Sequence, residues 1–111
     1  GLFIHTNHLV FDSMKDEVQD AEYVSSSSTT RWDLLSRWKA GVTDPSSLTV
    51  DQLLEQLAMH EGKPYSPCRH PEGDVHGFTL GTAVFEAPAG SFRLYKGQPC
   101  QQLFKDYEQP A

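Results

Sequence analysis

The chain of 111 residues begins with a short continuous apolar run, Leu2–Ile4, and then loses any regular spacing of apolar residues. A continuous apolar run favours burial on both faces of a sheet, so we predict a strand over residues 1–5. An acidic stretch and six consecutive Ser and Thr residues follow, the latter at 25–30. Because polar, low-complexity composition is typical of loops, we predict a long polar loop over residues 9–30.

The first helical pattern comes after this loop. Trp32, Leu35 and Trp38 recur three residues apart, which places them on one face of a helix. Either Thr29 or Thr30 is the expected N-cap, because a threonine hydroxyl accepts a hydrogen bond from a free N–H of the first turn. A glycine after the last periodic residue is the expected C-terminal stop.

A second helix is marked more clearly at its start. Thr49 and Gln52 have the spacing of a capping box, in which each side chain satisfies a backbone N–H beside the other. Gly62 is the expected end of this helix, and Pro45 separates it from the first. Its predicted buried stripe consists of Leu53, Leu54, Leu57 and Ala58.

The C-terminal part alternates like a β-hairpin. Residues 78–85 and 91–96 have strand composition, and a turn with Pro and Gly at 87–90 separates them. The tail is predicted to form one turn of helix around Leu103 and Phe104. One N-terminal strand, two helices and a C-terminal β-hairpin make an α+β chain, and residues 1–111 are predicted to be a single segment.

Composition narrows the classes of partner. A net charge of −6 without a basic stripe argues against binding of nucleic acid or of an anionic membrane. No apolar run has the length of a bilayer span, and no signal peptide is visible. Two cysteines are too few for a disulfide scaffold, so we expect reduced thiols in an intracellular protein, in the cytoplasm or an organelle. A first residue other than Met is what a piece of a longer polypeptide would have.

The motif His5-Thr6-Asn7-His8 offers three kinds of chemistry: metal binding, proton transfer by imidazole, or hydrogen bonding by the amide. In a strand, side chains three residues apart point to opposite faces, so His5 and His8 make a poor ligand pair. A metal site would need further ligands from the remaining His and Cys residues, and no spacing in the sequence identifies them. The Cys-x-His pair at 68–70 is not a recognised ligand pattern. We therefore predict no metal. The remaining His and Cys residues are His60, His70, His76, Cys68 and Cys100.

The amide of Asn7 can donate two hydrogen bonds without carrying a charge. At the end of a strand, such a donor can stabilise the oxyanion that forms when a carbonyl is attacked. Asn7 can equally cap the turn after the strand, and the residues alone leave both interpretations open. Cys68 has Arg69 and His70 beside it, but most single cysteines are simply packed.

Five segments taken together resemble the C-terminal part of a known family, the acyl-coenzyme A:6-aminopenicillanic acid acyltransferases (C45-type cysteine peptidase-like enzymes). In order they are HTNH (5–8), STTR (28–31), PYSPCRH (64–70), GFTL (77–80) and LYKGQPC (94–100). The resemblance extends over nearly the whole chain, with the segments in family order and similarly spaced.

The resemblance implies an N-terminal nucleophile hydrolase, an αββα sandwich whose precursor cleaves itself before a cysteine. That cysteine attacks an amide or thioester carbonyl. Asn7 would then belong to the oxyanion hole, with His5 and His8 as supports and Ser28 as the serine of the S-x-x-R motif. The nucleophile would lie on a missing N-terminal part or partner chain, since neither Cys68 nor Cys100 matches its position, and this chain alone would be inactive.

The substrate implied is a small-molecule amide or thioester, with acyl-CoA as one candidate and no cofactor. Arg31 and Arg69 are the cationic candidates for a substrate carboxylate, or for a structural carboxylate partner. Ser27 and His76 stand where the penicillin-forming member has an acidic residue and an arginine, so a different acyl donor is expected. His76 is then a candidate to contact the leaving group or a substrate carboxylate. Self-association through exposed sheet is a further expectation. The alternative class is a small non-catalytic binding module that docks a partner through its acidic, serine-rich loop.

Overall fold

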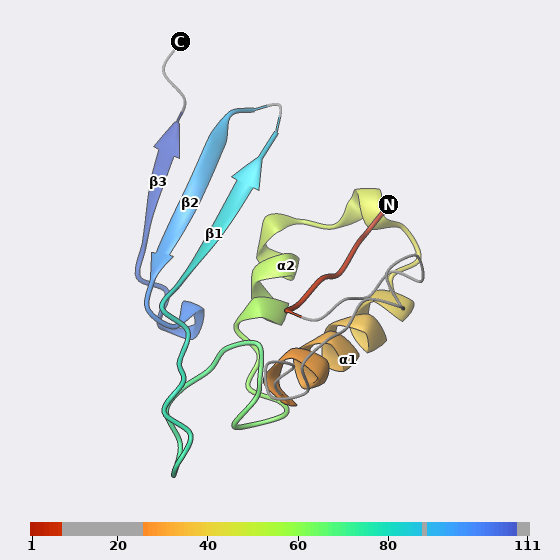
Figure 1. Ribbon diagram of the computed structural model, residues 1–111. Helices are drawn as coiled ribbons and strands as arrows, with labels where there is room; N and C mark the ends of the chain where they lie inside the picture. The colour runs from red at the N-terminus through yellow and green to blue at the C-terminus, as the bar shows by residue number, and fades with distance from the viewer. Residues whose placement is uncertain (8–25, 88, 109–111) are drawn as a thin grey trace.

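The computed structural model describes residues 1–7, 26–87 and 89–108, which form two α-helices and one antiparallel sheet of three strands. The predicted α+β class is confirmed. Figure 1 shows the sheet standing beside the two helices, with the N-terminal segment crossing the helical part. The elements are α1 (Ser26–Ala40), the 3₁₀ turn η2 (Pro45–Ser47), α2 (Val50–Leu57), β1 (Gly81–Glu86), β2 (Ser91–Lys96), the 3₁₀ turn η3 (Pro99–Gln101) and β3 (Phe104–Glu108).

The predicted N-terminal strand over residues 1–5 is wrong, because residues 1–7 belong to none of the described strands. Burial alternates along the segment: Leu2 and Ile4 are half-buried, whereas Phe3 is 83% exposed. A strand needs a hydrogen-bonded neighbour as well as apolar side chains, and this segment instead lies against α1, where Thr6 donates a hydrogen bond to the carbonyl oxygen of Ser28.

Helix α1 begins at Ser26, so the last five residues of the predicted polar loop are helical and the N-cap expected at Thr29 or Thr30 is wrong. Ser27 and Ser28 are 1% and 0% exposed. The sequence shows only the modest helix propensity of serine at these positions. It does not show the hydrogen bonds that Ser28 and Ser27 accept from Asn7 and Arg69, which stabilise this turn of the helix. The helix ends before Gly41, as predicted. Residues 9–25 of the predicted loop lie outside the described residues.

The capping box of α2 is confirmed. Thr49 Oγ1 accepts a hydrogen bond from the N–H of Gln52 at 3.2 Å, and Gln52 Oε1 accepts one from the N–H of Thr49 at 2.9 Å. The helix ends at Leu57 rather than near Gly62, because residues 58–66 turn back toward α1 instead of continuing the helix. Leu54 is the buried member of the predicted stripe.

We expect Thr49→Ala to lower the free energy of unfolding of the chain by about 1 kcal/mol, because it removes one side of the capping box. Urea unfolding followed by circular dichroism measures this change. Thr49→Ser is the matched control, since it keeps the hydroxyl and should stay within a few tenths of a kcal/mol of the natural chain. Equal losses for both variants would contradict the capping role.

The predicted hairpin is confirmed as β1 and β2, although β1 begins at Gly81 and not at residue 78. The helical turn predicted around Leu103 and Phe104 is wrong. The tail forms η3 and then β3, which pairs antiparallel with β2. The guanidinium of Arg93 contacts both carboxylate oxygens of Asp106, at 2.7 and 3.2 Å, and thereby lowers the pKa of that carboxyl. Partners on β2 therefore decide the conformation of this polar tail.

The two faces of the sheet differ in what covers them. Tyr95 is 5% exposed and lines a cavity together with Leu54 of α2, so this face lies toward the helices. Phe85, Phe92 and Tyr107 share the opposite face, where their rings stack across the three strands. Phe85 is 73% exposed. Within the described part of the chain, this second face is an uncovered aromatic surface.

The interior of the described residues is small and unusually polar. Leu34, Leu54 and Tyr95 are its buried large side chains, and the side chains with less than 2% exposure are Cys68, Ser27, Ser28 and Ser66. Buried hydroxyl groups do not supply the apolar surface that drives folding, so their burial directs attention to the contacts that they make. Neither described helix combines the length and the apolar content needed to cross a bilayer.

Candidate functional site

Asn7 is held from two sides by α1. Its backbone N–H donates to Ser28 Oγ at 2.8 Å, and its side-chain oxygen Oδ1 accepts from Arg31 Nη2 at 2.7 Å. A guanidinium has no acceptor, so the amide atom that faces it must be the oxygen. The Nδ2 group of Asn7 is then the end of the side chain left to donate, and Asn7 is exposed in this chain.

Two guanidinium groups converge on Ser27, one turn before Arg31. Arg31 Nε donates to the carbonyl oxygen and to Oγ of Ser27, at 3.0 and 3.1 Å. Arg69, which comes from the loop between α2 and the sheet, donates from Nη1 to the same Oγ at 3.2 Å. Ser27 therefore joins the S-x-x-R segment to the Cys-Arg-His segment.

The electrostatics of this cluster are cationic. Burial and, secondarily, the charge of Arg69 lower the pKa of Arg31 below its ordinary value. Among the described residues, neither arginine forms an ion pair, and the buried Nε of Arg69 has no hydrogen-bond partner. Buried charge normally has a counter-charge, so an anion such as a carboxylate would complement this cluster.

Arg69 is itself fixed by the segment that precedes β1. Its backbone N–H donates to Thr79 Oγ1 at 2.9 Å, and its carbonyl oxygen accepts from the N–H of Thr79 at 3.0 Å. A Cβ added to Gly77 would come within 2.9 Å of the guanidinium, so the side chain lies directly against this glycine. The GFTL segment thus both anchors the backbone of Arg69 and leaves room for its side chain.

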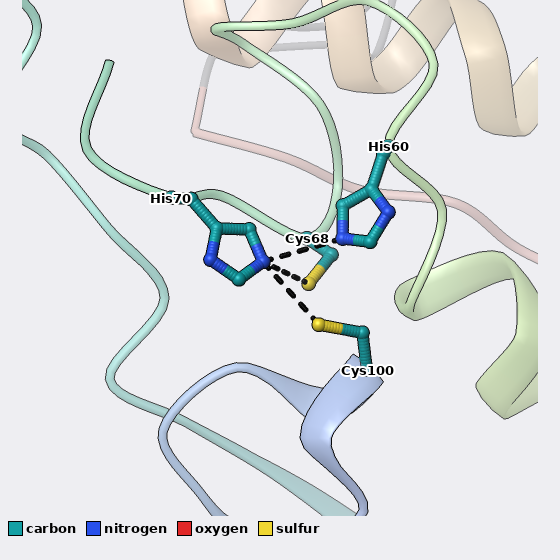
Figure 2. A group of neighbouring side chains, drawn as sticks. All are labelled: His60, Cys68, His70 and Cys100. Carbon is teal, nitrogen blue, oxygen red and sulfur yellow. Dashed lines mark hydrogen bonds between the residues drawn. The ribbon is translucent and has the colours of Figure 1, made fainter.

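A second cluster lies on the other side of the same loop. His60, Cys68, His70 and Cys100 point toward one another, and their nearest nitrogen and sulfur atoms all lie within 4.8 Å of each other (Figure 2). His70 Nε2 is 3.2 Å from His60 Nε2, 3.7 Å from Cys68 Sγ and 3.3 Å from Cys100 Sγ. Among the described residues, these four His and Cys side chains lie close enough together to bind one metal ion.

Electrostatics argue against Cys68 as a nucleophile. Its side chain is fully buried, and burial raises the pKa of the thiol. A reactive cysteine needs the opposite shift and an accessible sulfur. Desolvation and then the neighbouring His70 lower the pKa of His60, which favours a neutral imidazole.

The structure brings together four of the residues singled out in the sequence, Asn7, Ser28, Arg31 and Arg69. His5 is exposed, and the described contacts that hold Asn7 come from α1 rather than from this histidine. His76 is exposed, and no described hydrogen bond connects it to the cluster. His8 lies outside the described residues, as does most of the loop required by the alternative binding-module hypothesis.

Sequence reasoning missed the second cluster, although a signal was present. Both cysteines of the chain and two of its five histidines take part in it. That signal was one of residue type: a Cys-x-His pair, the remaining cysteine and a histidine eight residues before Cys68 all have side chains that bind zinc. The two histidines that stand closest together in the sequence, His5 and His8, drew attention away from it; among the described residues, His5 is not a member of the cluster.

No protein-family model, curated protein or solved structure matches this chain. The structure by itself shows an α+β chain in which two clusters of side chains meet at the loop between α2 and β1. The resemblance to the C45-type acyltransferases stays a prediction.

Proposed function

We propose that this chain supplies the oxyanion-binding part of an acyl-transfer site. The Nδ2 group of Asn7 donates a hydrogen bond to the oxygen that becomes negative when a cysteine thiolate attacks an amide or thioester carbonyl. The cysteine belongs to a part of the protein outside this sequence, which precursor self-cleavage exposes. The observation that carries the proposal is the hydrogen bond from Arg31 to Oδ1 of Asn7.

That hydrogen bond has two consequences for an oxyanion donor. It sets the rotation of the carboxamide, so that the N–H groups are oriented before the reaction begins. It also withdraws electron density from the amide oxygen, which makes the N–H groups on Nδ2 stronger donors. The N–H of Asn7 bonded to Ser28 fixes the backbone in the same way.

The arrangement of the five recognised segments supports the same proposal. HTNH contacts the S-x-x-R segment through Asn7, and the residue before that segment, Ser27, contacts Arg69. Arg69 in turn contacts the GFTL segment, and His70 reaches the cysteine of the last segment. Four of the segments are thus connected by hydrogen bonds through Arg31 and Arg69, and the fifth lies against His70, the residue next to Arg69.

The cationic cluster suggests the chemical class of the substrate. Arg31 and Arg69 have no carboxylate partner among the described residues; Arg31 contacts Asn7, and Arg69 contacts Ser27, to which Arg31 also donates. We assign them to a carboxylate of the acyl donor or acceptor, which would place the reacting carbonyl beside the Asn7 amide. An amide or thioester that carries a carboxylate is the substrate expected.

The uncovered aromatic face of the sheet fits an αββα arrangement. Helices lie toward one face, and the stacked rings of Phe85, Phe92 and Tyr107 occupy the other. In a four-layer sandwich that second face packs against another sheet. We propose that the part carrying the nucleophile provides this sheet, and that the chain alone associates with itself through the same face.

The complete coding sequence should therefore yield a protein that forms a covalent acyl-cysteine. Incubation with acyl-CoA esters and with carboxylate-bearing acyl amides, followed by mass spectrometry, is expected to show one acyl group on a cysteine other than Cys68 and Cys100. Alkylation of that cysteine beforehand should abolish the adduct, and the 111-residue chain alone is the negative control. Acylation of Cys68 or Cys100, or no acylation by any of these donors, would refute the proposal.

A further inference from the structure

We propose that His60, Cys68, His70 and Cys100 together bind one zinc ion in a closed tetrahedral site. Zinc in such sites lies about 2.0–2.1 Å from nitrogen and about 2.3 Å from sulfur. A tetrahedron with these bonds places two nitrogens about 3.3 Å apart and a nitrogen and a sulfur about 3.6 Å apart. The three distances from His70 Nε2 are 3.2, 3.7 and 3.3 Å, and all four ligand atoms lie within 4.8 Å of each other.

Hydrogen bonding by itself does not explain this packing. His70 Nε2 has three neighbours at contact distance, namely His60 Nε2 and the sulfurs of Cys68 and Cys100. An imidazole nitrogen carries either one proton or one lone pair, so it can form only one good hydrogen bond. Four electron-pair donors directed toward a common centre are instead the arrangement that a cation satisfies (Figure 2).

Hydrogen bonds and local structure position the two cysteines without a metal ion. Ser66 Oγ donates to the carbonyl oxygen of Cys68 at 2.6 Å, and the N–H of Cys68 donates to the carbonyl oxygen of Met59 at 3.0 Å. Cys100 lies on η3 directly after the buried Pro99. These contacts fix the loop and the turn that carry the two thiols, so little ordering remains to be done when an ion binds.

The donor set favours zinc over other common cations. Two thiolates and two imidazoles are the ligands of tetrahedral zinc, whereas magnesium and calcium prefer oxygen. Four protein ligands leave no open position for a reacting water, so the site is structural. A cavity of about 330 Å³, lined by His60, Cys68 and His70 among others, gives an ion access to the cluster.

The four ligands of the zinc site come from three parts of the chain. His60 follows α2, Cys68 and His70 flank Arg69, and Cys100 precedes β3. One ion would therefore tie the helical part to the sheet and would hold the backbone on both sides of Arg69. In a chain whose interior is as small as this one, a metal link of that kind contributes directly to folding.

Titration of the reduced, metal-free chain with Co²⁺ and Zn²⁺ tests the proposal. Co²⁺ should produce the visible absorption of a tetrahedral complex and a near-ultraviolet thiolate charge-transfer band, with one ion bound per chain. Zn²⁺ should displace Co²⁺ and raise the unfolding temperature. Absence of these bands, or binding without thiolate charge transfer, would overturn the assignment.

Variants separate this site from adventitious binding. His60→Gln and Cys100→Ser should each weaken Zn²⁺ binding by more than about 100-fold, because loss of a direct ligand exceeds the 10- to 100-fold effect of removing a supporting contact. His60 is exposed, so His60→Gln should leave the metal-free fold intact. His76→Gln is the matched control, and its affinity should equal that of the natural chain. Undiminished binding in His60→Gln and Cys100→Ser, or a Cys68–Cys100 disulfide that persists in reductant, would refute the proposal.

Discussion

Replacing Asn7 by alanine in the complete protein is expected to lower the rate of acylation about 100- to 1,000-fold, the usual effect of removing one oriented oxyanion donor. The loss corresponds to about 2.7–4 kcal/mol of transition-state stabilisation. Because the donor acts on charge that develops during attack, kcat and kcat/KM should fall together while KM changes little. Single-turnover measurement of acyl-enzyme formation gives the rate of the relevant step.

Asn7→Asp is the sharper companion variant. It keeps the size of the side chain and an oxygen for the contact with Arg31, but it removes both N–H donors. We expect activity at or below that of Asn7→Ala, since a carboxylate would also repel the oxyanion. An Asn7→Asp enzyme with nearly natural activity would show that Asn7 serves only to position Arg31, and it would remove the amide from the chemistry.

Gly62→Ala is expected to lower the free energy of unfolding of the chain by about 2–5 kcal/mol. Gly62 has φ of +87°, where an L-residue costs about 1–2 kcal/mol. An added Cβ would also lie 2.9 Å from Leu34 Cδ1 and 2.9 Å from Thr30 Cγ2 on α1, and such overpacking costs about 1–3 kcal/mol. Urea unfolding with and without the substitution measures the sum.

Gly73→Ala separates these two contributions. Gly73 also has a positive φ, +57°, but an added Cβ would meet nothing within 4 Å. Only the backbone cost of about 1–2 kcal/mol applies there. If Gly62→Ala and Gly73→Ala lower stability equally, the turn at residue 62 does not pack against α1 as described.

Features that depend on neighbours in the sequence could be predicted from it. The capping box at Thr49 and Gln52, the stop at Gly41 and the hairpin of β1 and β2 all arise from contacts within a few residues. The α+β class follows from these elements. The residues of the S-x-x-R and Cys-Arg-His segments were recognisable as a series, although their contacts were not.

Features that depend on distant partners could not be predicted. Every residue of strand β3 is at least partly exposed, and the strand owes its conformation to β2, while the apolar run at residues 1–5 has no described strand beside it. Apolar composition predicts burial, but a strand also requires a hydrogen-bonded neighbour, and only the fold supplies one.

In both side-chain clusters, the cationic one and the His and Cys one, the sequence determines the chemistry of the residues and the fold determines their contacts. The sequence by itself determined which residues could bind a metal or an anion, and it determined the local caps and turns, because side-chain chemistry and short-range hydrogen bonds are properties of the chain. The tertiary structure alone decided that Cys100 meets His70 across 30 positions and that Arg31 orients Asn7 across 24. The first meeting depends on how the loop between α2 and β1 lies against η3, and the second on how the N-terminal segment lies against α1; no short-range pattern in the sequence encodes either path.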